Sequence, residues 1–430
     1  MPHSVLLASA SFGGTLASVR AFGRAGIDTH VVSSNRLSAA AWSRYATRVH
    51  SAPRETYTSD FVNRLTEIGA ANPGLLLLPT SDQTAWAFTA YAATLRQHFL
   101  LYQPPLDTTR RILDKKLLAD AALSAGLYPL PTWDPVSRDE VKKLSRTLPY
   151  PLLIKPRTHV GRVRNNKGVV VETASDLLRK YQDFCVREQV DDTLSGMDHR
   201  PVLQPFAIDG SDQIQSVTGF IDKSGELFVT RRSVKVYQRS EPVGVGICHE
   251  SLPPLATLSD AAHRLCRELN YFGLFELEFV RFDGQWAIID FNPRLYNQIG
   301  LDIGRGMPLP LFAFLDATGQ HEALRTAVVA AGRAEQPGPV FCDRFTLKAI
   351  LFAKAIFRRA SSAERRKWHQ WLAQHINNSV DVALDEQDQL PGLIHAFSEV
   401  LLGLKALPRF LLSKSARSLR IAPALKRAPL

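Results

Sequence analysis

Short apolar runs alternate with helical patterns in the first hundred residues. Residues 5–8 form an apolar run of β type, a loop rich in serine and glycine and a helical stretch follow, and residues 29–33 form the next run. Residues 75–78 and 99–102 are further apolar runs, each closely followed by proline, as expected of buried parallel strands. This pattern predicts an open α/β domain over residues 1–105.

The pattern from residue 106 onward indicates a second domain, which we expect to end near residue 330. A capped helix is predicted from Asp107 to Gly126, after which three prolines mark an extended crossing. Strand-like runs then alternate with helical stretches, which is typical of an α+β body with antiparallel strands. These runs are residues 152–155, 168–172, 202–206, 227–231, 275–282 and 286–291.

The composition limits the classes of protein to which the chain can belong. Hydrophobic residues make up 45% and charged residues 22% of the 430 residues, which argues against a largely disordered chain. No apolar run approaches the roughly 20 residues of a membrane-spanning helix, and the N-terminus lacks the regions of a secretory signal. The four cysteines show no C-x-x-C spacing and fit reduced thiols, so we expect the protein in the cytoplasm.

The positive charge is concentrated in the last hundred residues, which look mostly helical and follow a Gly/Pro break at residues 336–339. Residues 331–430 hold 16 Lys and Arg against 8 Asp and Glu, so they supply +8 of the net charge of +11. Because the body is nearly neutral, we expect no nucleic-acid partner. Within this extension, residues 343–359 form an apolar helix edged by cations. That helix either packs on its own protein or contacts a membrane surface or a protein partner.

The stretch with the clearest chemistry is an acidic hairpin over residues 275–294. Glu278 lies on the first strand, a turn follows, and Asp290 and Asn292 lie on the returning strand. Because residues i and i+2 of a strand face the same way, Asp290 and Asn292 share a face that the turn brings beside Glu278. Two carboxylates and an amide are oxygen donors of the kind that Mg²⁺ prefers. The alternative is a hairpin whose carboxylates face water.

A lysine and a cationic loop precede this hairpin. Lys155 ends an apolar strand, where its stem packs and its ammonium emerges, so it either holds phosphate oxygens or is an ordinary solvated lysine. Residues 159–168 form a polar, cationic loop with glycines near both ends. Such a loop either closes over a triphosphate or is a plain exposed hairpin loop.

The order and spacing of these segments are more specific than any one of them. In chain order they are Asp114-Lys115, Lys155-Pro156, the strand 202–206, Gly210-Ser211-Asp212 and the acidic hairpin. In this order the sequence resembles the ATP-grasp superfamily over about residues 1–320, in particular its carboxylate-amine ligases and the ATP-binding domain of the carbamoyl phosphate synthetase large chain. The resemblance implies a Rossmann-like α/β domain ahead of an ATP-grasp domain, with an ATP lid over about residues 150–207.

The resemblance also implies a role for each matching residue. Lys115, Lys155 and Lys167 would contact phosphate, Gln204 and the backbone of Phe206 and Ala207 would read adenine, Asp212 would bind ribose, and Glu278, Asp290 and Asn292 would hold Mg²⁺, or Mn²⁺ in its place. Lys155 and Arg294 would stabilise the transferring phosphoryl group. Two positions depart from the family pattern, since many members have glutamate in place of Asp290 and an acidic residue in place of Gln204.

Substrate contacts are predicted at two places. Arg231 and Lys235 lie where this family usually engages the acceptor, and they either clamp a carboxylate or belong to a solvated basic strand. Ser11 and Asp82 lie in loops at the carboxyl ends of predicted parallel strands. Ligands of open α/β sheets gather at those ends, although such loops also serve as simple turns.

Three functional hypotheses follow from the resemblance. The first is an ATP-dependent ligase that joins a carboxylate to an amine through an acyl phosphate, which yields an amide, ADP and phosphate. The second is carboxylation through carboxyphosphate, and the third is an inactive nucleotide-binding module that acts through its basic tail at a membrane or partner. The ligase needs ATP and Mg²⁺ but no protein nucleophile. The identity of the acid and the amine stays open, as does a homo-oligomeric state.

Overall fold

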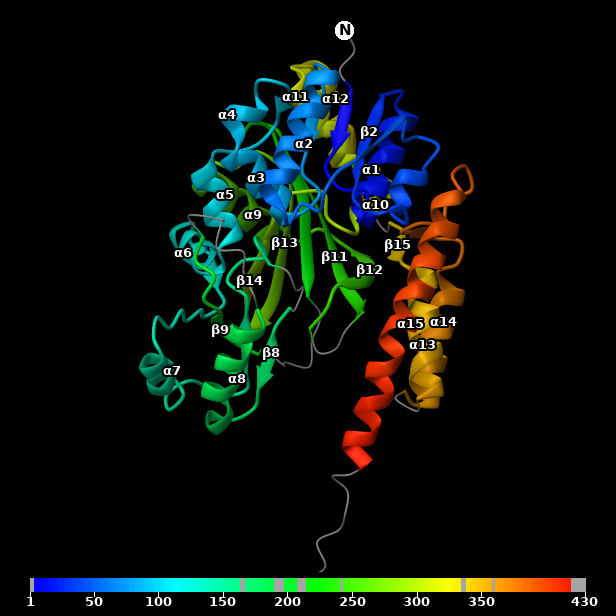
Figure 1. The fold of residues 1–430 in the computed structure, drawn as a ribbon. Helices are drawn as coiled ribbons and strands as arrows, with labels where there is room; N and C mark the ends of the chain where they lie inside the picture. Colours follow the sequence, from blue (N-terminus) through cyan, green and yellow to red (C-terminus); the bar gives the residue numbers. More distant parts are fainter. Residues whose placement is uncertain are drawn as a thin grey trace, which may run out of the picture.

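The structure is a computed structural model with two large β-sheets, a small one and a column of C-terminal helices (Figure 1). It describes residues 4–162, 167–188, 197–206, 214–239, 243–333, 338–357 and 360–418, and for residues 406–418 the backbone alone. Among the described residues, no helix combines the length and the hydropathy that a bilayer crossing requires.

The N-terminal sheet has five parallel strands in the order β3-β2-β1-β4-β5. The strands are β1 (Val5–Leu7), β2 (Thr29–Ser33), β3 (Arg48–Ser51), β4 (Leu76–Leu78) and β5 (Leu100–Leu101). Between them lie α1 (Gly13–Arg24), the 3-10 helix η1 (Ala39–Trp42), α2 (Thr58–Ala71), α3 (Asp82–Ala90) and α4 (Ala92–Leu95). β1, β2 and β4 are buried on both faces, as their apolar runs predict, whereas β3 is a polar edge strand.

The second large sheet has eight strands in the order β16-β15-β12-β11-β10-β13-β14-β6, and its six inner strands pair antiparallel with one another, whereas β16 and β6 pair in parallel at the two edges. The strands from the middle of the chain are β6 (Tyr128–Pro129), β10 (Gln215–Ile221), β11 (Phe228–Gln238), β12 (Gly246–Leu252), β13 (Gly273–Phe282) and β14 (Gln285–Asn292). The associated helices are α5 (Leu106–Leu113), α6 (Lys115–Ser124), α9 (Ala256–Glu268), α10 (Ile299–Gly304), α11 (Leu309–Ala317) and α12 (His321–Arg333).

A small three-stranded sheet, β8-β7-β9, faces the large one across a gap in the lower part of Figure 1. It consists of β7 (Leu152–Lys155), β8 (Val169–Val171) and β9 (Val202–Pro205), with α7 (Arg138–Leu144) and α8 (Ala174–Arg187) packed on it. Its own apolar core includes Leu152 and Ile154 of β7 and Phe184 of α8. The described chain is therefore an α/β fold with one parallel sheet, one largely antiparallel sheet and a small antiparallel sheet.

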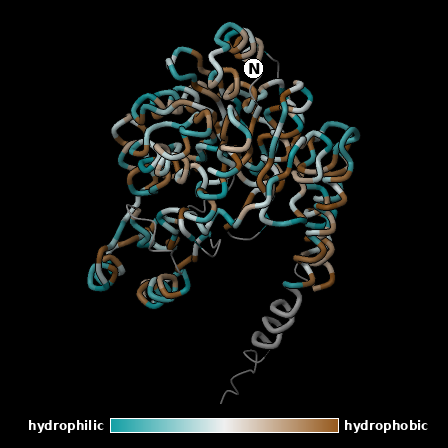
Figure 2. Tube along the Cα trace, turned by 45° about the horizontal axis from the view of Figure 1, so that its top comes forward, coloured by the Kyte–Doolittle hydropathy of each residue, from teal (hydrophilic) through white to brown (hydrophobic). Residues whose placement is uncertain are grey.

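The C-terminal extension contains helices and also supplies the last two strands of the large sheet. The elements are β15 (Val340–Cys342), α13 (Arg344–Ile356), α14 (Ser362–Gln374), β16 (Ser379–Asp381) and α15 (Leu390–Ser418). Figure 2 shows hydrophobic positions recurring along this column of helices. The buried ion pair between Arg20 Nε and Asp388 Oδ2, 2.9 Å long, ties the extension to α1. These contacts make the extension part of the folded body.

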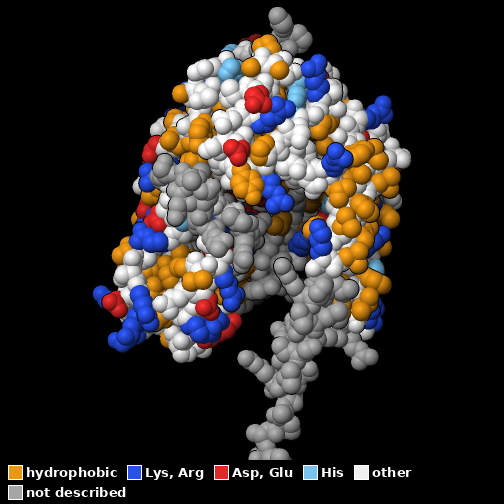
Figure 3. Space-filling view, in the orientation of Figure 1, with side chains coloured by type: hydrophobic (Ala, Val, Ile, Leu, Met, Phe, Trp, Pro, Cys, Tyr) orange, Lys and Arg blue, Asp and Glu red, His pale blue; other side chains and the backbone are white. Residues whose placement is uncertain are grey.

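The helix proposed for membrane or partner contact packs on its own protein along one face. Leu347 and Leu351 of α13 are buried, whereas Phe352 and Ile356 are exposed. Figure 3 shows hydrophobic side chains gathered on the outer side of the helical column. Residues 358 and 359 of the proposed segment lie outside the described residues.

A histidine-carboxylate pair fastens α15 to the start of α13, and it gives a testable pH dependence. His395 Nε2 lies 3.1 Å from both carboxylate oxygens of Asp343. Burial opposes the charge of His395, but the hydrogen bond and the charge of Asp343 outweigh it and raise the pKa of His395. A raised folded-state pKa means that the pair stabilises fully below the unfolded value of about 6.5, and that this stabilisation is lost as the pH rises through the folded value.

We therefore expect His395→Gln to lower the thermal midpoint at about pH 6 and to have a much smaller effect at about pH 8.5. Thermal unfolding of both proteins at the two pH values measures the difference. An equal loss at both values would show that the imidazolium charge contributes nothing to the docking of α15.

Candidate functional site

A cavity of about 800 Å³ opens between the small sheet and the antiparallel strands of the large one. Its wall includes residues of β7, β9, β11, β13 and β14, together with two residues of α14. The ionisable side chains that line it are Lys155, His159, Lys167, Lys235, His249, Glu276, Glu278, Arg281, Asp290, Arg294 and Glu364. This concentration of charge in a cavity of that size is typical of a binding site for a charged small molecule.

The hairpin of β13 and β14 forms the acidic wall. In its antiparallel register Glu278 stands opposite Asp290, and Glu276 stands opposite Asn292. The turn places Asp283 and Gly284 at φ values of 48° and 71°, the left-handed region that an Asp-Gly pair adopts readily. The structure thus brings Glu278, Asp290 and Asn292 together on one wall of the cavity.

The carboxylates of Asp290 and Glu278 each face a lysine. Lys115 Nζ lies 3.3 Å from Asp290 Oδ1, and Lys235 Nζ lies 3.0 Å from Glu278 Oε1. Lys155 Nζ donates to the backbone oxygen of Ile289 at 3.4 Å. Burial would raise the pKa of Asp290, but Lys115 and Lys155 lower it to about 2. Burial and the charge of Lys115 lower the pKa of Lys155 to about 8, so the site holds closely spaced opposite charges at neutral pH.

A capping interaction positions Lys115. The helix predicted over residues 107–126 is broken at Asp114, whose Oδ1 accepts from the backbone N–H groups of Lys116 and Leu117 at the start of α6. Its Oδ2 accepts from Arg157 Nε at 2.7 Å, and the Lys115 N–H donates to the Arg157 carbonyl at 3.0 Å. Arg157, just beyond β7, therefore couples Lys115 to the strand that carries Lys155.

Arg294 is fixed between the two large sheets. Its Nε donates to Asp82 Oδ1 and an Nη donates to Asn292 Oδ1, both at 2.8 Å. Burial lowers the pKa of Arg294, but Asp82 more than compensates and raises it. Asp82, at the start of α3, thus contacts Arg294, and it is not among the described residues that line the cavity. Its contribution at the site is to orient this cation.

The residues predicted to read adenine lie at the opposite wall. Gln204 and Phe206 line the cavity, and Gln204 Nε2 donates to Thr132 Oγ1 at 2.9 Å, which leaves its Oε1 as the acceptor. The Phe206 N–H donates to the Pro151 carbonyl. That N–H is therefore committed to the small sheet, and only the Phe206 carbonyl could contribute to a hinge. Ala207 and Asp212 lie outside the described residues.

The predicted phosphate loop is described in part, with residues 163–166 outside the described residues. Lys167 and His159 both line the cavity. Burial lowers the pKa of Lys167, although Asp82 and Asp290 oppose this effect. Burial and the charge of Lys167 depress the pKa of His159 well below its usual value. His159 is consequently uncharged at neutral pH. From the sequence, it was identified only as one residue of a cationic loop.

The two cations predicted to bind substrate have different surroundings. Lys235 lines the cavity beside Glu278. Arg231, four residues earlier on β11, is buried and donates to the carbonyl of Ala331 in α12. Burial and Arg305 lower its pKa. Arg231 therefore packs under the sheet and is not among the described residues that line the cavity, so the prediction of a substrate contact at Arg231 has no structural support.

Several residues of the wall were not singled out from the sequence. Glu276 accepts from Ser216 Oγ at 2.8 Å and from Asn292 Nδ2 at 3.1 Å, and burial followed by the charge of Glu278 raises its pKa to about 7. Its i, i+2 relation to Glu278 was a signal that could have found it. Trp368 and Glu364 come from α14, and no local pattern connects that helix to the site.

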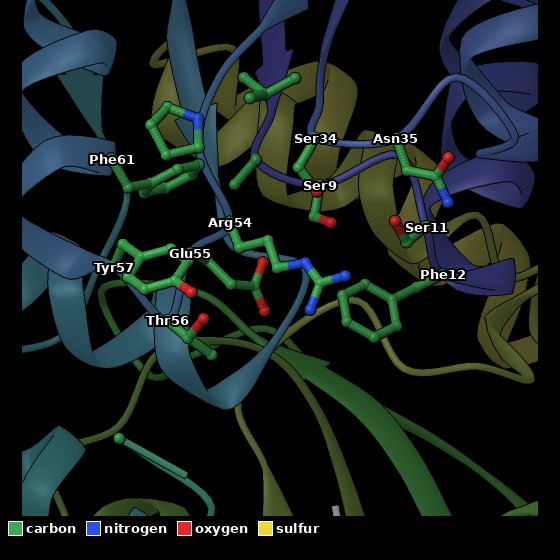
Figure 4. A pocket seen from close by; sticks show the side chains of 14 residues that line it. Ser9, Ser11, Phe12, Ser34, Asn35, Arg54, Glu55, Thr56, Tyr57 and Phe61 are labelled. Carbon is green, nitrogen blue, oxygen red and sulfur yellow. The ribbon is translucent and has the colours of Figure 1, made fainter. Parts of the chain in front are cut away.

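A second cavity, of about 710 Å³, opens at the carboxyl ends of β1, β2 and β3. Ser11 lines it, as expected of a loop at that edge of the sheet. Figure 4 shows Ser9, Glu55 and Arg54 in its middle, between Phe12 on one side and Tyr57 on the other. Gly161, from the loop that leads to Lys167, lines it as well.

The donor set fits a divalent cation that binds together with an anion. No group of three or more His, Cys, Asp or Glu side chains in the described part of the chain forms a metal cage. Two carboxylates and one amide would instead fill only part of the coordination shell of a metal ion. The remaining positions are left for phosphate oxygens and water, which is how Mg²⁺ is usually held. In this structure Lys115, Lys235 and Arg294 contact the side-chain oxygens of Asp290, Glu278 and Asn292, respectively. A polyanion that attracts these cations would free the oxygens for a metal ion.

Comparisons with known proteins identify the fold. No family model matches the chain, and no curated protein matches it. The biotin carboxylase domain of *Hydrogenobacter thermophilus* 2-oxoglutarate carboxylase superposes with a TM-score of 0.60 at 15% identity, over 74% of this chain and 69% of that one. Its crystal structure contains MgADP, ADP and bicarbonate.

Two further solved structures have the same fold. *Campylobacter jejuni* biotin carboxylase gives a TM-score of 0.60 at 16% identity, over 78% of this chain and 74% of that one. *Staphylococcus aureus* N5-carboxyaminoimidazole synthetase gives 0.56 at 12% identity, over 74% of this chain and 77% of that one. The likeness confirms the ATP-grasp fold that the sequence resemblance predicted.

Proposed function

We propose that the protein is an ATP-dependent ligase that joins a carboxylate to an amine through an acyl phosphate, and releases an amide, ADP and phosphate. The observation that carries this proposal is the position of two lysines at the acidic hairpin: Lys155 lines the cavity, and the buried Lys115 pairs with Asp290, which lines the same cavity. A triphosphate needs cations and a metal at the same place, and this cavity offers both sets of ligands. The solved structure with MgADP bound supports the same use of the fold.

In this proposal ATP lies along the cavity from Gln204 and Phe206 to the hairpin. The Gln204 Oε1 would accept from the adenine amino group, and Lys115, Lys155 and Lys167 would contact the phosphates. Glu278, Asp290 and Asn292 would hold Mg²⁺, or Mn²⁺, which when bound neutralises the phosphate charge. Lys235 would turn from Glu278 toward the carboxylate of the acid substrate.

The chain's own residues would then act on phosphoryl transfer. A carboxylate oxygen of the acid attacks the γ-phosphorus, and ADP leaves with the electron pair of the broken P–O bond. Arg294, held by Asp82 and Asn292 at 2.8 Å, would stabilise the negative charge on the transferring group without reorganising. The amine then attacks the acyl carbon and expels phosphate. Ser11 and the second cavity lie on the N-terminal side of this centre and would receive a substrate.

A second candidate keeps the first half-reaction and changes the acid to bicarbonate. The named enzymes among the structural neighbours, biotin carboxylase and N5-carboxyaminoimidazole synthetase, favour it. Carboxyphosphate would replace the acyl phosphate in that case. ADP release that depends on bicarbonate and on no other acid would identify this reaction.

The test of the main proposal traps the activated acid. The protein is incubated with ATP, Mg²⁺, hydroxylamine and a panel of carboxylic acids, and hydroxamate and ADP are measured. We expect one class of acid to give equal amounts of both products. ADP without hydroxamate from any acid would contradict an acyl phosphate, and no ADP under any condition would support an inactive nucleotide-binding module.

Two adjacent lysines offer a matched test of the phosphate contacts. Lys115 is buried and faces Asp290, which lines the cavity, whereas Lys116 pairs with Asp120 on the exposed face of α6. We expect Lys115→Ala to weaken the binding of AMP-PNP with Mg²⁺ by at least about tenfold, because a buried cation on phosphate is lost. Lys116→Ala should leave the affinity unchanged. Calorimetric titration of both variants measures the difference, and equal affinities would remove Lys115 from the site.

A further inference from the structure

The second cavity has a single carboxylate among its described lining residues, that of Glu55. Glu55 follows β3, is half-buried, and points into the middle of the cavity together with Ser9 (Figure 4). The cavity contains one cation, Arg54, among these residues, and its exposed guanidinium lies toward Phe12. A ligand that enters the cavity therefore meets a half-buried carboxylate.

The surroundings of Glu55 hold it close to the proposed reaction centre. Burial raises the pKa of Glu55, and it outweighs the Ser81 and Ser9 hydroxyls and the charge of Arg294, which lower that pKa. The nearby charge of Asp82 raises it as well. Because Asp82 is already bound to Arg294, Glu55 is the carboxylate that a ligand can engage at this end of the cavity.

Neighbouring residues connect the linings of the two cavities. Gly161, which lines the second cavity, donates its N–H to Gln83 Oε1 at 2.6 Å, next to Asp82 at the start of α3. Asp82 in turn pairs with Arg294, which lines the first cavity, and the charge of Asp82 reaches Lys167. The Gly161 side of the second cavity therefore lies near the Asp82–Arg294 pair, at the centre where the acyl phosphate is proposed to form.

The rest of the lining suits a polar and uncharged body. Hydroxyl and amide groups surround Glu55, and two exposed aromatic rings stand at the rim. The polar groups are Ser9, Ser11, Ser34, Asn35 and Thr56, and the rim rings are Phe12 and Tyr57. Such a lining matches a molecule with several hydroxyl or amide groups, and a volume of about 710 Å³ accommodates one of moderate size.

We propose that this cavity binds the amine substrate, a primary amine whose body carries hydroxyl or amide groups, and that Glu55 binds its ammonium group and accepts a proton from it. This inference rests on the proposed ligase function. The ammonium gives one proton to the Glu55 carboxylate, and the free amine nitrogen then forms a bond to the acyl carbon. The C–O bond to phosphate breaks, its electron pair leaves with phosphate, and the second nitrogen proton passes to solvent.

Binding can be tested without turnover. Saturation-transfer NMR is recorded with glucosamine, serinol and glycinamide at neutral pH, and with N-acetylglucosamine as the uncharged counterpart of the first. We expect at least one of the three amines to bind wild-type protein and N-acetylglucosamine not to bind. Glu55→Gln should abolish the signal, whereas Glu67→Gln, on the exposed side of α2, should retain it. No binding by any amine, or equal binding to the Glu55→Gln protein, would overturn the proposal.

A kinetic measurement separates this proposal from the ligase function itself. Amide formation with the amine that binds is compared with hydroxamate formation from uncharged hydroxylamine, using the same acid. We expect Glu55→Gln to lower the ratio of amide to hydroxamate by at least about tenfold, and a higher pH to restore part of it, because more free amine is then present. An unchanged ratio would remove Glu55 from the reaction, whereas absence of hydroxamate in wild-type protein would contradict the ligase function.

Discussion

Replacement of Asp290 by alanine is expected to lower the rate of acid-dependent ADP release by about a thousandfold, the scale at which a preorganised charge at a reacting group contributes. Asp290 stands opposite Glu278 in the hairpin register and faces Lys115 across 3.3 Å. Its loss would remove a carboxylate from the proposed metal site and leave Lys115 and Lys155 without their shared counter-charge. Hydroxamate and ADP formation with the acid identified in the trapping experiment measures the effect.

The control for this change is Asp260→Ala, which removes an exposed carboxylate from α9. It should keep full activity. Asp290→Asn serves as a second variant, because it retains the volume of the side chain, and thermal unfolding confirms that both proteins fold. Turnover within about tenfold of wild type in folded Asp290→Asn and Asp290→Ala proteins would contradict the assigned site.

The second large effect is expected on stability, at Gly14→Ala. The start of α1 lies against residues 295–297, and a Cβ at Gly14, in the first turn of this helix, would overlap the carbonyl oxygen of Tyr296 and stand 2.9 Å from its carbonyl carbon. Backbone cannot yield as a flexible side chain does, so α1 and the 295–297 segment must separate. We expect the free energy of unfolding to fall by about 3 kcal/mol, the upper end of the usual cost of overpacking. Urea unfolding of the variant measures this loss.

Gly332→Ala is the matched change. A Cβ at Gly332, near the end of α12, meets nothing within 4 Å. Alanine is the better helix former, so this variant should be neutral or more stable by up to about 1 kcal/mol. Equal effects of the two substitutions would show that the contact between Gly14 and Tyr296 does not hold α1 beside the segment that follows Arg294.

The strand periodicity of the acidic hairpin was sufficient to predict its geometry. The i, i+2 spacing of Asp290 and Asn292 put both on one face, and the Asp-Gly turn fixed the partner of Asp290 as Glu278, as the register shows. Lys155 followed from an apolar strand that ends in a lysine. Each of these inferences is local, because a strand's side-chain direction is set by its own backbone.

Long-range packing accounts for most of what the sequence did not indicate. β10 and β12 were missed because glycine and polar residues interrupt their apolar pattern, which is tolerated in strands that have partners on both sides. Periodicity alone did not show that Arg231 packs against α12. Glu55 gave no signal either, since its significance depends on Arg294 and Asp82, which are distant in the chain.

The most direct measurement is a crystal structure of the protein with AMP-PNP and Mn²⁺, in which anomalous scattering locates the metal. The account predicts a Mn²⁺ peak between the carboxylates of Glu278 and Asp290, with the ammonium groups of Lys115 and Lys155 on phosphate oxygens of the same nucleotide. A bound nucleotide whose metal and phosphates lie away from these four side chains would contradict it.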